Sequence, residues 1–253
     1  MCLILFALHH HRDWPLVIAA NRDEFHQRPT QTASFWEDHP DILGGKDLQE
    51  GGTWMGIHTQ SLRLAALTNY RNPFLKKENP PSRGHLVAEY LRQNTPSEAF
   101  LRNLQEKGHL YNGFNLICGR PDRLFYYSNE KAPPIPIPPG VHGLSNHLLD
   151  TPWPKVSLGC ALLQESLTKG AQEEDLIHLL QNRNRPPDAA LPDTGMGLEW
   201  ERILSPLFIV SPQYGTRSST ILRVHRSKEI FFTEVSWDAE GRETGRVSFT
   251  WKP

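Results

Sequence analysis

Short apolar runs separated by polar residues and glycines recur along the chain, and they predict a protein rich in β-strands. The first two runs, CLILFAL at 2–8 and LVIAAN at 16–21, are joined by a polar turn that contains Pro15. Two more strands are predicted at 53–58 and 62–69. The first quarter of the chain is therefore expected to form hairpins, in which the start of the first strand lies near the end of the second.

Two helical patterns follow these strands. Residues 83–93 (RGHLVAEYLRQ) place their apolar side chains on one face at helical spacing. The next helix is expected to have Thr95 as its N-cap, with Pro96 at the first helical position and Glu98 completing a capping box. Gly108 is the expected stop signal.

Strands and helices alternate again in the rest of the chain. The segments expected there are strands at 113–119, 124–128 and 141–146, a proline-rich connector at 132–139, helices at 155–168 and 173–183, a polar loop at 184–199, and strands at 207–210, 218–225, 229–237 and 246–251. Each helix pair has to bury its apolar stripe on a sheet, and there are more strands than one small sheet uses. We expect one α+β domain over 1–253 with two stacked sheets and helices outside them. Periodicity alone leaves a single large sheet open.

Composition narrows the classes of partner and compartment. The 253 residues carry a net charge of −1 without a stripe of Lys and Arg, which gives no reason to expect nucleic acid as a partner. No apolar run approaches the roughly 18 residues of a membrane-spanning helix, and the first run lacks the flanks of a signal peptide. The three cysteines are widely separated and odd in number, so we expect free thiols and a cytoplasmic location, with an organelle lumen as the alternative.

The cysteine directly behind the initiator methionine is the first candidate for chemistry. Removal of Met1 would make Cys2 the N-terminal residue, with a thiol and a free α-amine on the same residue. The ordinary pKa values of these groups, about 8 for the amine and about 8.5 for the thiol, allow the amine to act as the base for its own side chain. A buried strand residue without a chemical role is the alternative.

The polar cluster Asn21-Arg22-Asp23-Glu24 closes the second apolar run. Hairpin pairing would bring this cluster near Cys2, where a guanidinium favours the thiolate form of a thiol. The alternative is an ion-pair cluster or a helix N-cap at the surface. Three consecutive histidines at 9–11 would point in alternating directions, so we expect a solvated turn there and no metal site.

Seven motifs occur together and in order: MC, ANRDEFHQRP, GGTWMG, ALTNYR, GFNL, GLSN and YGTRSST. Spread over residues 1 to 220, this set resembles the NRDE family, the group that includes transport and Golgi organisation protein 2. That family is similar to the N-terminal nucleophile (Ntn) hydrolases, especially the cysteine branch that contains penicillin V acylase and bile salt hydrolase. The resemblance implies a four-layer αββα sandwich, which agrees with the layered α+β fold expected above.

The resemblance also implies roles for particular residues. Cys2 matches the nucleophile, and Arg22 and Asp23 match an arginine and an aspartate beside it. In the acylases these two residues are separated by two others, whereas here they are adjacent, so one of them is expected to point elsewhere. The remaining matches are Asn146 as a donor of the oxyanion hole, Asn69 as a second polar contributor, and Arg217 as a late arginine near the nucleophile.

These residue types suit attack on a carbonyl. Thiolate attack creates an oxyanion, which one fixed amide N–H stabilises by roughly 3 kcal/mol; the alternative for both asparagines is turn formation. We expect a cysteine Ntn hydrolase that needs no cofactor and acts on a small-molecule amide, or on an acyl ester or thioester. The alternative is a carrier of a hydrophobic ligand, haem or acyl-coenzyme A, on the same fold. Such a haem would be labile, because no C-x-x-C-H motif is present.

Overall fold

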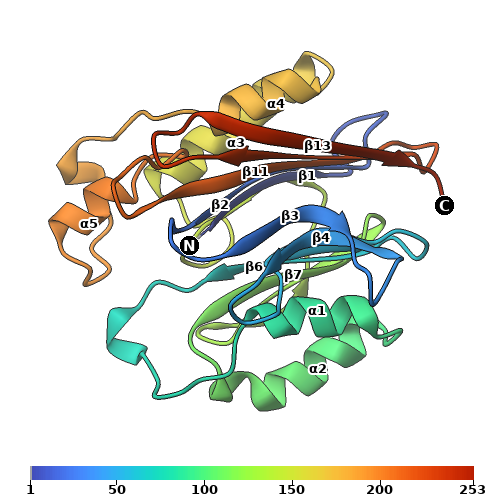
Figure 1. Ribbon diagram of the computed structural model, residues 1–253, viewed down its shortest axis with the longest axis horizontal. Helices are drawn as coiled ribbons and strands as arrows, with labels where there is room; N and C mark the ends of the chain where they lie inside the picture. Colours follow the sequence, from blue (N-terminus) through green and yellow to red (C-terminus); the bar gives the residue numbers. More distant parts are fainter. Residues whose placement is uncertain (1) are drawn as a thin grey trace.

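Two antiparallel β-sheets lie face to face in the computed structural model, which describes residues 2–253 (Figure 1). The first sheet contains, in spatial order, β10 (Gly140–Leu144), β1 (Cys2–Leu8), β2 (Leu16–Phe25), β11 (Tyr214–Val224), β12 (Ile230–Trp237) and β13 (Glu243–Trp251). The second contains β3 (Thr30–Phe35), β4 (Ile42–Asp47), β5 (Met55–His58), β6 (Arg63–Asn69), β7 (Phe114–Arg120), β8 (Arg123–Ser128) and β9 (Ala132–Pro136). The expected pair of stacked sheets is confirmed, and a single large sheet is not formed.

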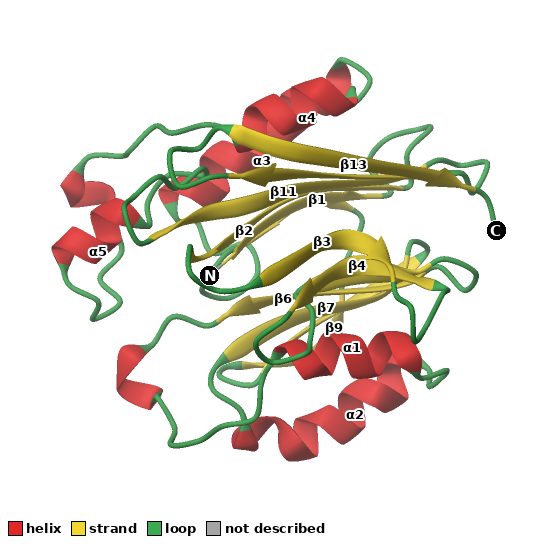
Figure 2. Cartoon of the chain, viewed as in Figure 1, coloured by secondary structure: helices red, strands yellow, loops and turns green. Residues whose placement is uncertain are grey.

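Helices cover the outer face of each sheet (Figure 2). They are α1 (Gly84–Arg92) and α2 (Ser97–Lys107) on the second sheet, and α3 (Pro154–Thr168) and α4 (Glu173–Leu180) on the first. The short α5 (Leu198–Ile203) and the 3-10 turns Pro73–Leu75, Gly108–Leu110 and Asp188–Ala190 lie in connections. No helix in the described part of the chain is long and apolar enough to cross a bilayer.

The alternation of side chains along β1 explains why that strand is apolar throughout. Ile4, Phe6 and Leu8 point into the core between the sheets, whereas Leu3 and Leu5 point toward α3 and α4. Both faces of the strand are buried, so no polar position interrupts the run. Cys2 has the same parity as the residues that face the second sheet, which directs this residue toward the space between the sheets.

Several local predictions were wrong. Helix α2 begins at Ser97 with Pro96 in the N-cap position and extended (φ −55°, ψ 143°), and no side chain caps it. Thr95 therefore lies before the cap, where its hydroxyl bonds Gln93, and the predicted capping box is not formed. The predicted strand at 207–210 is also absent. Leu207 and its neighbours are buried by packing on the α3 and α4 layer without pairing in a sheet.

Four elements were missed for identifiable reasons. Strands β3 and β4 (TQTASF and ILGGKD) are too polar or too rich in glycine to stand out as apolar runs. Strand β9 lies in the expected proline-rich connector, and proline is tolerated because β9 is an edge strand that pairs only with β8. Helix α5 begins inside the expected polar loop and has only six residues.

Candidate functional site

The first hairpin brings the two candidate segments into direct register. Cys2 pairs with Arg22 across β1 and β2, as the hairpin prediction requires. Cys2 is 7% exposed, and burial raises the pKa of its thiol above the usual value. The nearby Arg22 guanidinium acts in the opposite direction, because it favours the thiolate. A thiol in this position therefore needs a base or a bound partner before it ionises at neutral pH.

A cavity of about 140 Å³ opens beside this cysteine, at the ends of strands from both sheets. Four of the six predicted site residues line it, namely Cys2, Arg22, Asp23 and Asn69. Its walls also include residues of β4 and β12 and the segment that begins α1. The structure therefore gathers segments that lie between residue 2 and residue 234 of the sequence around one thiol.

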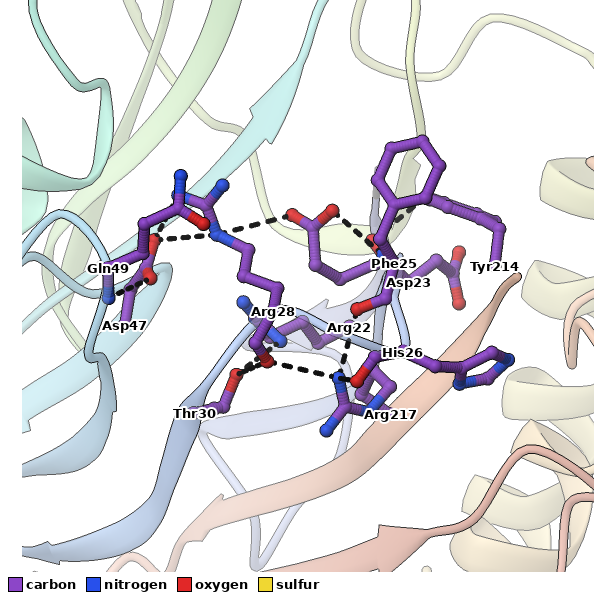
Figure 3. Close-up of polar contacts among 11 residues, drawn as sticks. Arg22, Asp23, Phe25, His26, Arg28, Thr30, Asp47, Gln49, Tyr214 and Arg217 are labelled. Carbon is purple, nitrogen blue, oxygen red and sulfur yellow. Dashed lines mark hydrogen bonds and ion pairs between the residues drawn. The ribbon is translucent and has the colours of Figure 1, made fainter.

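Arg22 and Asp23 point to opposite sides of β2, because adjacent residues in a strand alternate (Figure 3). The Arg22 Nη1 atom donates to Thr30 Oγ1 at 3.1 Å on the side of the second sheet. The Asp23 carboxylate accepts from Thr216 Oγ1 at 2.7 Å on the other side. The two side chains therefore point in different directions, as their adjacency in the sequence predicts. The side chain of Arg22 lies on the same side of the sheet as Cys2, between the two sheets.

Asp23 lies in a buried charged environment beneath the first sheet. Burial raises the pKa of its carboxyl, and the Lys155 ammonium opposes that rise. Lys155 is itself buried at the start of α3, donates to the Leu204 carbonyl at 3.0 Å, and has a pKa lowered to about 8 by burial. Asp23 thus belongs to a group of buried charges that includes Lys155 of α3. The hydroxyl of Thr216 holds its carboxylate in place.

Asn146 does not line the cavity. It is fully buried, and its Nδ2 atom donates to the backbone oxygen of Asn69 at 3.0 Å. Its Oδ1 atom accepts from Arg71 Nη2 at 3.3 Å. Asn69 lines the cavity, and its side-chain amide makes no hydrogen bond to any of residues 2–253. Of the two asparagines, Asn69 therefore has the free donor, and Asn146 holds the backbone that carries it.

Arg217 also lies outside the cavity lining. The pairing of β2 with β11 shifts between Thr216 and Ser218, so Arg217 is the extra residue of a β-bulge. Its Nη1 atom donates to the carbonyl oxygens of Phe25 (3.0 Å), His26 (2.9 Å) and Arg28 (3.2 Å), as Figure 3 shows. In the structure this arginine fixes the turn after β2.

A second charged cluster lies next to Asn146. Arg71 Nη1 bonds Glu201 Oε2 at 2.6 Å, and the two side chains are 3% and 4% exposed. The Arg71 guanidinium lies 4.9 Å from the centre of the Trp153 ring, and the backbone amide of Thr194 donates to Glu201 at 3.1 Å. This cluster joins α5 to the segment after β6 and to the start of α3.

Sequence reasoning missed several residues that border the cavity. Arg28 forms an ion pair with Asp47 at 2.5 Å, and Arg83 and Glu234 approach the cavity from α1 and β12. Arg28 belongs to the motif ANRDEFHQRP, which was a usable signal. Glu234 is the single acidic residue inside the strand IFFTEVSW, and a buried strand seldom keeps a carboxylate without a partner. Arg83 had no signal beyond its position at the start of a predicted helix.

A protein-family model described as Transport and Golgi organisation 2 matches residues 1–239. The chain belongs to this family. It is 39% identical over 276 aligned positions to the Transport and Golgi organization protein 2 homolog of Homo sapiens, with 99% of each chain covered. The Bos taurus homolog is 37% identical with 93% of each chain covered, and the Drosophila melanogaster protein is 27% identical with 92% and 91% covered. The family expected from the ordered motifs is therefore confirmed.

Proposed function

We propose that this chain is a cysteine hydrolase of the N-terminal nucleophile type, which cleaves a small amide, ester or thioester in the cavity beside Cys2. The observation that carries the proposal is the shared lining of Cys2, Arg22 and Asn69 around one open space. The layering of helices on two antiparallel sheets agrees with that type of fold. Three free cysteines agree with the reducing environment of the cytoplasm, which we include in the proposal.

The first step of the proposed reaction makes the nucleophile. Met1 lies outside the described residues, and its removal is part of the proposal because it frees the α-amine of Cys2. The neutral amine accepts the thiol proton, directly or through one water molecule, and becomes an ammonium. Arg22, paired with Cys2 in the register, stabilises the resulting thiolate.

In the second step the thiolate sulfur forms a bond to the carbonyl carbon, and the carbonyl oxygen takes the negative charge. Among the predicted site residues that line the cavity, Asn69 has the side-chain amide that can donate to that oxygen. Asn146 contributes indirectly, since it holds the Asn69 backbone oxygen from the buried side. We therefore propose a positioning role for Asn146 in place of the direct role that the resemblance implies.

The remaining steps return the enzyme to its starting state. The C–N bond breaks, its electron pair goes to nitrogen, and the α-ammonium gives that nitrogen a proton as the amine leaves. Water then attacks the thioester, with the α-amine accepting one of its protons. The C–S bond breaks, and the thiol regains a proton as the carboxylic acid leaves. No oxidant, reductant or metal enters this balance.

The carrier alternative receives less support from the cavity. Its volume of about 140 Å³ is below the roughly 300–1,000 Å³ of pockets that hold drug-sized ligands. No histidine is among the described residues that line it. The cavity does not fit a haem, and we derive no step through one. Binding of haem or acyl-coenzyme A stays a prediction, which a Soret shift or a thermal shift on addition of either ligand would test.

The hydrolase proposal is tested at the cysteine itself. Intact mass reports whether Met1 is removed, and a panel of small amides and thioesters is assayed with the wild-type protein, Cys2→Ala and the matched control Cys160→Ser. We expect turnover in wild type and in Cys160→Ser, none in Cys2→Ala, and an acyl adduct on the Cys2 peptide after rapid quenching. Turnover by Cys2→Ala would exclude the nucleophile, and turnover with Met1 retained would exclude the α-amine as base.

A further inference from the structure

Arg83 is a cation of the cavity that the proposed chemistry does not use. It occupies the N-cap position of α1, lines the cavity together with Cys2, and is half-buried. Its Nη1 atom donates to the Gly113 carbonyl at 3.0 Å. In the described chain no carboxylate lies within 4.0 Å of its guanidinium. A guanidinium held in a cavity by one neutral acceptor keeps most of its donors for something else.

The segment before α1 is fixed by backbone packing. A Cβ atom on Gly52 would lie 2.5 Å from the carbonyl carbon of Gly84, so the loop and the helix start approach as closely as only glycine permits. The amide of Thr53 donates to the Gly84 carbonyl at 3.2 Å across the same contact. The motif GGTWMG therefore positions the backbone that carries Arg83, which makes its place beside the cavity a built feature.

Two of the other cavity cations, Arg28 and Lys46, differ from Arg83 because acidic groups of the protein pair with them. Arg28 bonds Asp47 at 2.5 Å and lies 3.8 Å from Glu24, and Lys46 bonds Asp38 at 3.0 Å. A charge that is partly removed from water without a counter-ion is costly, and a ligand anion offsets that cost. Arg22 also has no described ion pair, but it donates to Thr30 and is assigned above to the Cys2 thiolate. Arg83 is thus the remaining cavity cation without a described carboxylate partner, and it is available to bind an anion.

The balance of charge in the lining favours an anion with one charge. Four cations line the cavity (Arg22, Arg28, Lys46 and Arg83), and so do four acidic residues (Asp23, Glu24, Asp47 and Glu234). Burial raises the pKa values of the Asp23 and Glu234 carboxyls above their ordinary values. A monoanion such as a carboxylate suits this balance, whereas a phosphate dianion would meet more repulsion from the same acids.

We propose that Arg83 binds a carboxylate of the substrate, so that the compound cleaved at Cys2 is a small amide or acyl compound with a free carboxylate near its reacting carbonyl. The cleavage part rests on the function proposed above. Planar guanidinium and carboxylate groups match through paired hydrogen bonds, which fix the orientation of the ligand as well as its charge. Arg83 is accordingly a substrate-binding residue that selects for anionic substrates.

The charge selectivity is measured at Cys2 without any turnover. The protein is treated with iodoacetate (anionic) or iodoacetamide (neutral), and labelling of the Cys2 peptide is followed by mass spectrometry. We expect the ratio of the iodoacetate rate to the iodoacetamide rate to fall by about tenfold in Arg83→Gln, because one close positive charge is removed. Arg83→Lys keeps the charge and most of the ratio. The control Arg102→Gln, on the exposed face of α2, leaves it unchanged.

A protection experiment identifies the kind of anion. N-acetylglycine is expected to slow iodoacetamide labelling of Cys2 in wild type but not in Arg83→Gln, and its neutral amide is expected to protect neither protein. Protection by inorganic phosphate but not by N-acetylglycine would overturn the carboxylate assignment. A rate ratio that is unchanged in Arg83→Gln, or a Cys2 that neither reagent labels, would overturn the anion site.

The outcomes separate this inference from the proposed function. Arg83-dependent labelling and protection with no hydrolysis of any substrate would retain the anion site and remove the hydrolase. Hydrolysis that needs Cys2 but is equally fast for charged and neutral substrates in wild type and Arg83→Gln would do the reverse. Thermal unfolding of Arg83→Gln, measured beside Arg102→Gln, checks that the variant is folded in each case.

Discussion

Two arginines in the connection between β6 and α1 lie in opposite surroundings. Arg71 is 3% exposed and is held by Glu201 at 2.6 Å and by Asn146 at 3.3 Å. Arg83 borders an open cavity and has one neutral acceptor, the carbonyl of Gly113. The residue type is the same, and the partners decide its role. A guanidinium that the protein pairs with a carboxylate holds segments together. A guanidinium that faces a cavity and has no carboxylate partner of its own is available to a ligand.

The cluster around Arg71 shows what a guanidinium paired within the protein does. Glu201 comes from α5 and also accepts from the Thr194 amide, and Arg71 lies over the Trp153 ring just before α3. The ion pair thus fastens three segments that are separated by many residues. Buried pairs of this kind need both partners, because the charge left behind by removal of one has no solvent to receive it.

The largest effect is expected from breaking this pair. Arg71→Met should lower the free energy of unfolding by about 3–5 kcal/mol, since the Glu201 carboxylate is left buried without its counter-ion. Arg83→Gln should change it by less than about 1 kcal/mol, because no described ion pair is lost. Urea denaturation of both variants at pH 7 measures the difference.

A double variant is the control for that prediction. Arg71→Met combined with Glu201→Gln removes both charges and should recover a large part of the lost stability. A double variant as unstable as Arg71→Met would show that packing on Trp153 matters more than the charge pair. Equal losses in Arg71→Met and Arg83→Gln would contradict the distinction between the two arginines.

The next largest effect concerns the proposed reaction. Asn69→Ala removes the side-chain amide that we assign to the oxyanion, and kcat should fall by roughly 10²–10³. Stability should change little, because that amide makes no hydrogen bond to the described residues. Steady-state kinetics on the substrate found with wild type measures the loss. A variant with unchanged kcat would mean that another donor, such as a backbone amide, receives the oxyanion.

The different positions of Asn69 and Asn146 show how much of the site can be predicted from the sequence. The Cys2–Arg22 pairing follows from a short hairpin, and its register is fixed locally by two apolar runs and a turn. The layers follow from alternating strand and helix patterns. Asn146 and Asn69 are both asparagines of ordered motifs, and nothing in either motif says which one faces the cavity. That depends on contacts from Arg71, which are absent from local sequence.

Other parts of the site could not be predicted for a related reason. The side chain of Arg217 is turned toward three carbonyl oxygens by a one-residue bulge, and a shift in register has no signature in the motif YGTRSST. Glu201 meets Arg71 across 130 positions, from a helix of six residues too short to show a periodic pattern. Arg83 acquires its role only because a cavity forms beside it.

A smaller effect is expected for Asn146. Asn146→Ala removes a buried side chain that donates to Asn69 and accepts from Arg71, and it should cost about 1–3 kcal/mol of stability. Its kcat should fall less than that of Asn69→Ala, because its effect passes through the backbone of Asn69. Thermal melts and kinetics on the two variants compare them directly. A larger catalytic loss in Asn146→Ala than in Asn69→Ala would reverse the assignment of donor and support.

The smallest effect tests a buried acid that borders the cavity. Glu234 accepts from the Ala33 amide at 2.7 Å and contributes to the electrostatic environment of Arg22, and burial raises the pKa of its carboxyl above its ordinary value of 4.5. The folded state therefore holds this proton more tightly than the unfolded chain does. Its contribution to stability is present below pH 4.5 and is lost as the pH rises through the higher folded pKa.

Glu234→Gln keeps an oxygen for the Ala33 amide and removes the ionisation. Its stability relative to wild type should therefore improve between about pH 4 and about pH 7.5, by about 1 kcal/mol or less, as urea melts at the two pH values would show. The exposed Glu240→Gln should show no such trend. The variant also removes the negative charge near Arg22, which should raise the iodoacetate preference of Cys2. If the iodoacetate preference of Cys2 falls instead, Glu234 affects Cys2 by holding the local structure and not by its charge.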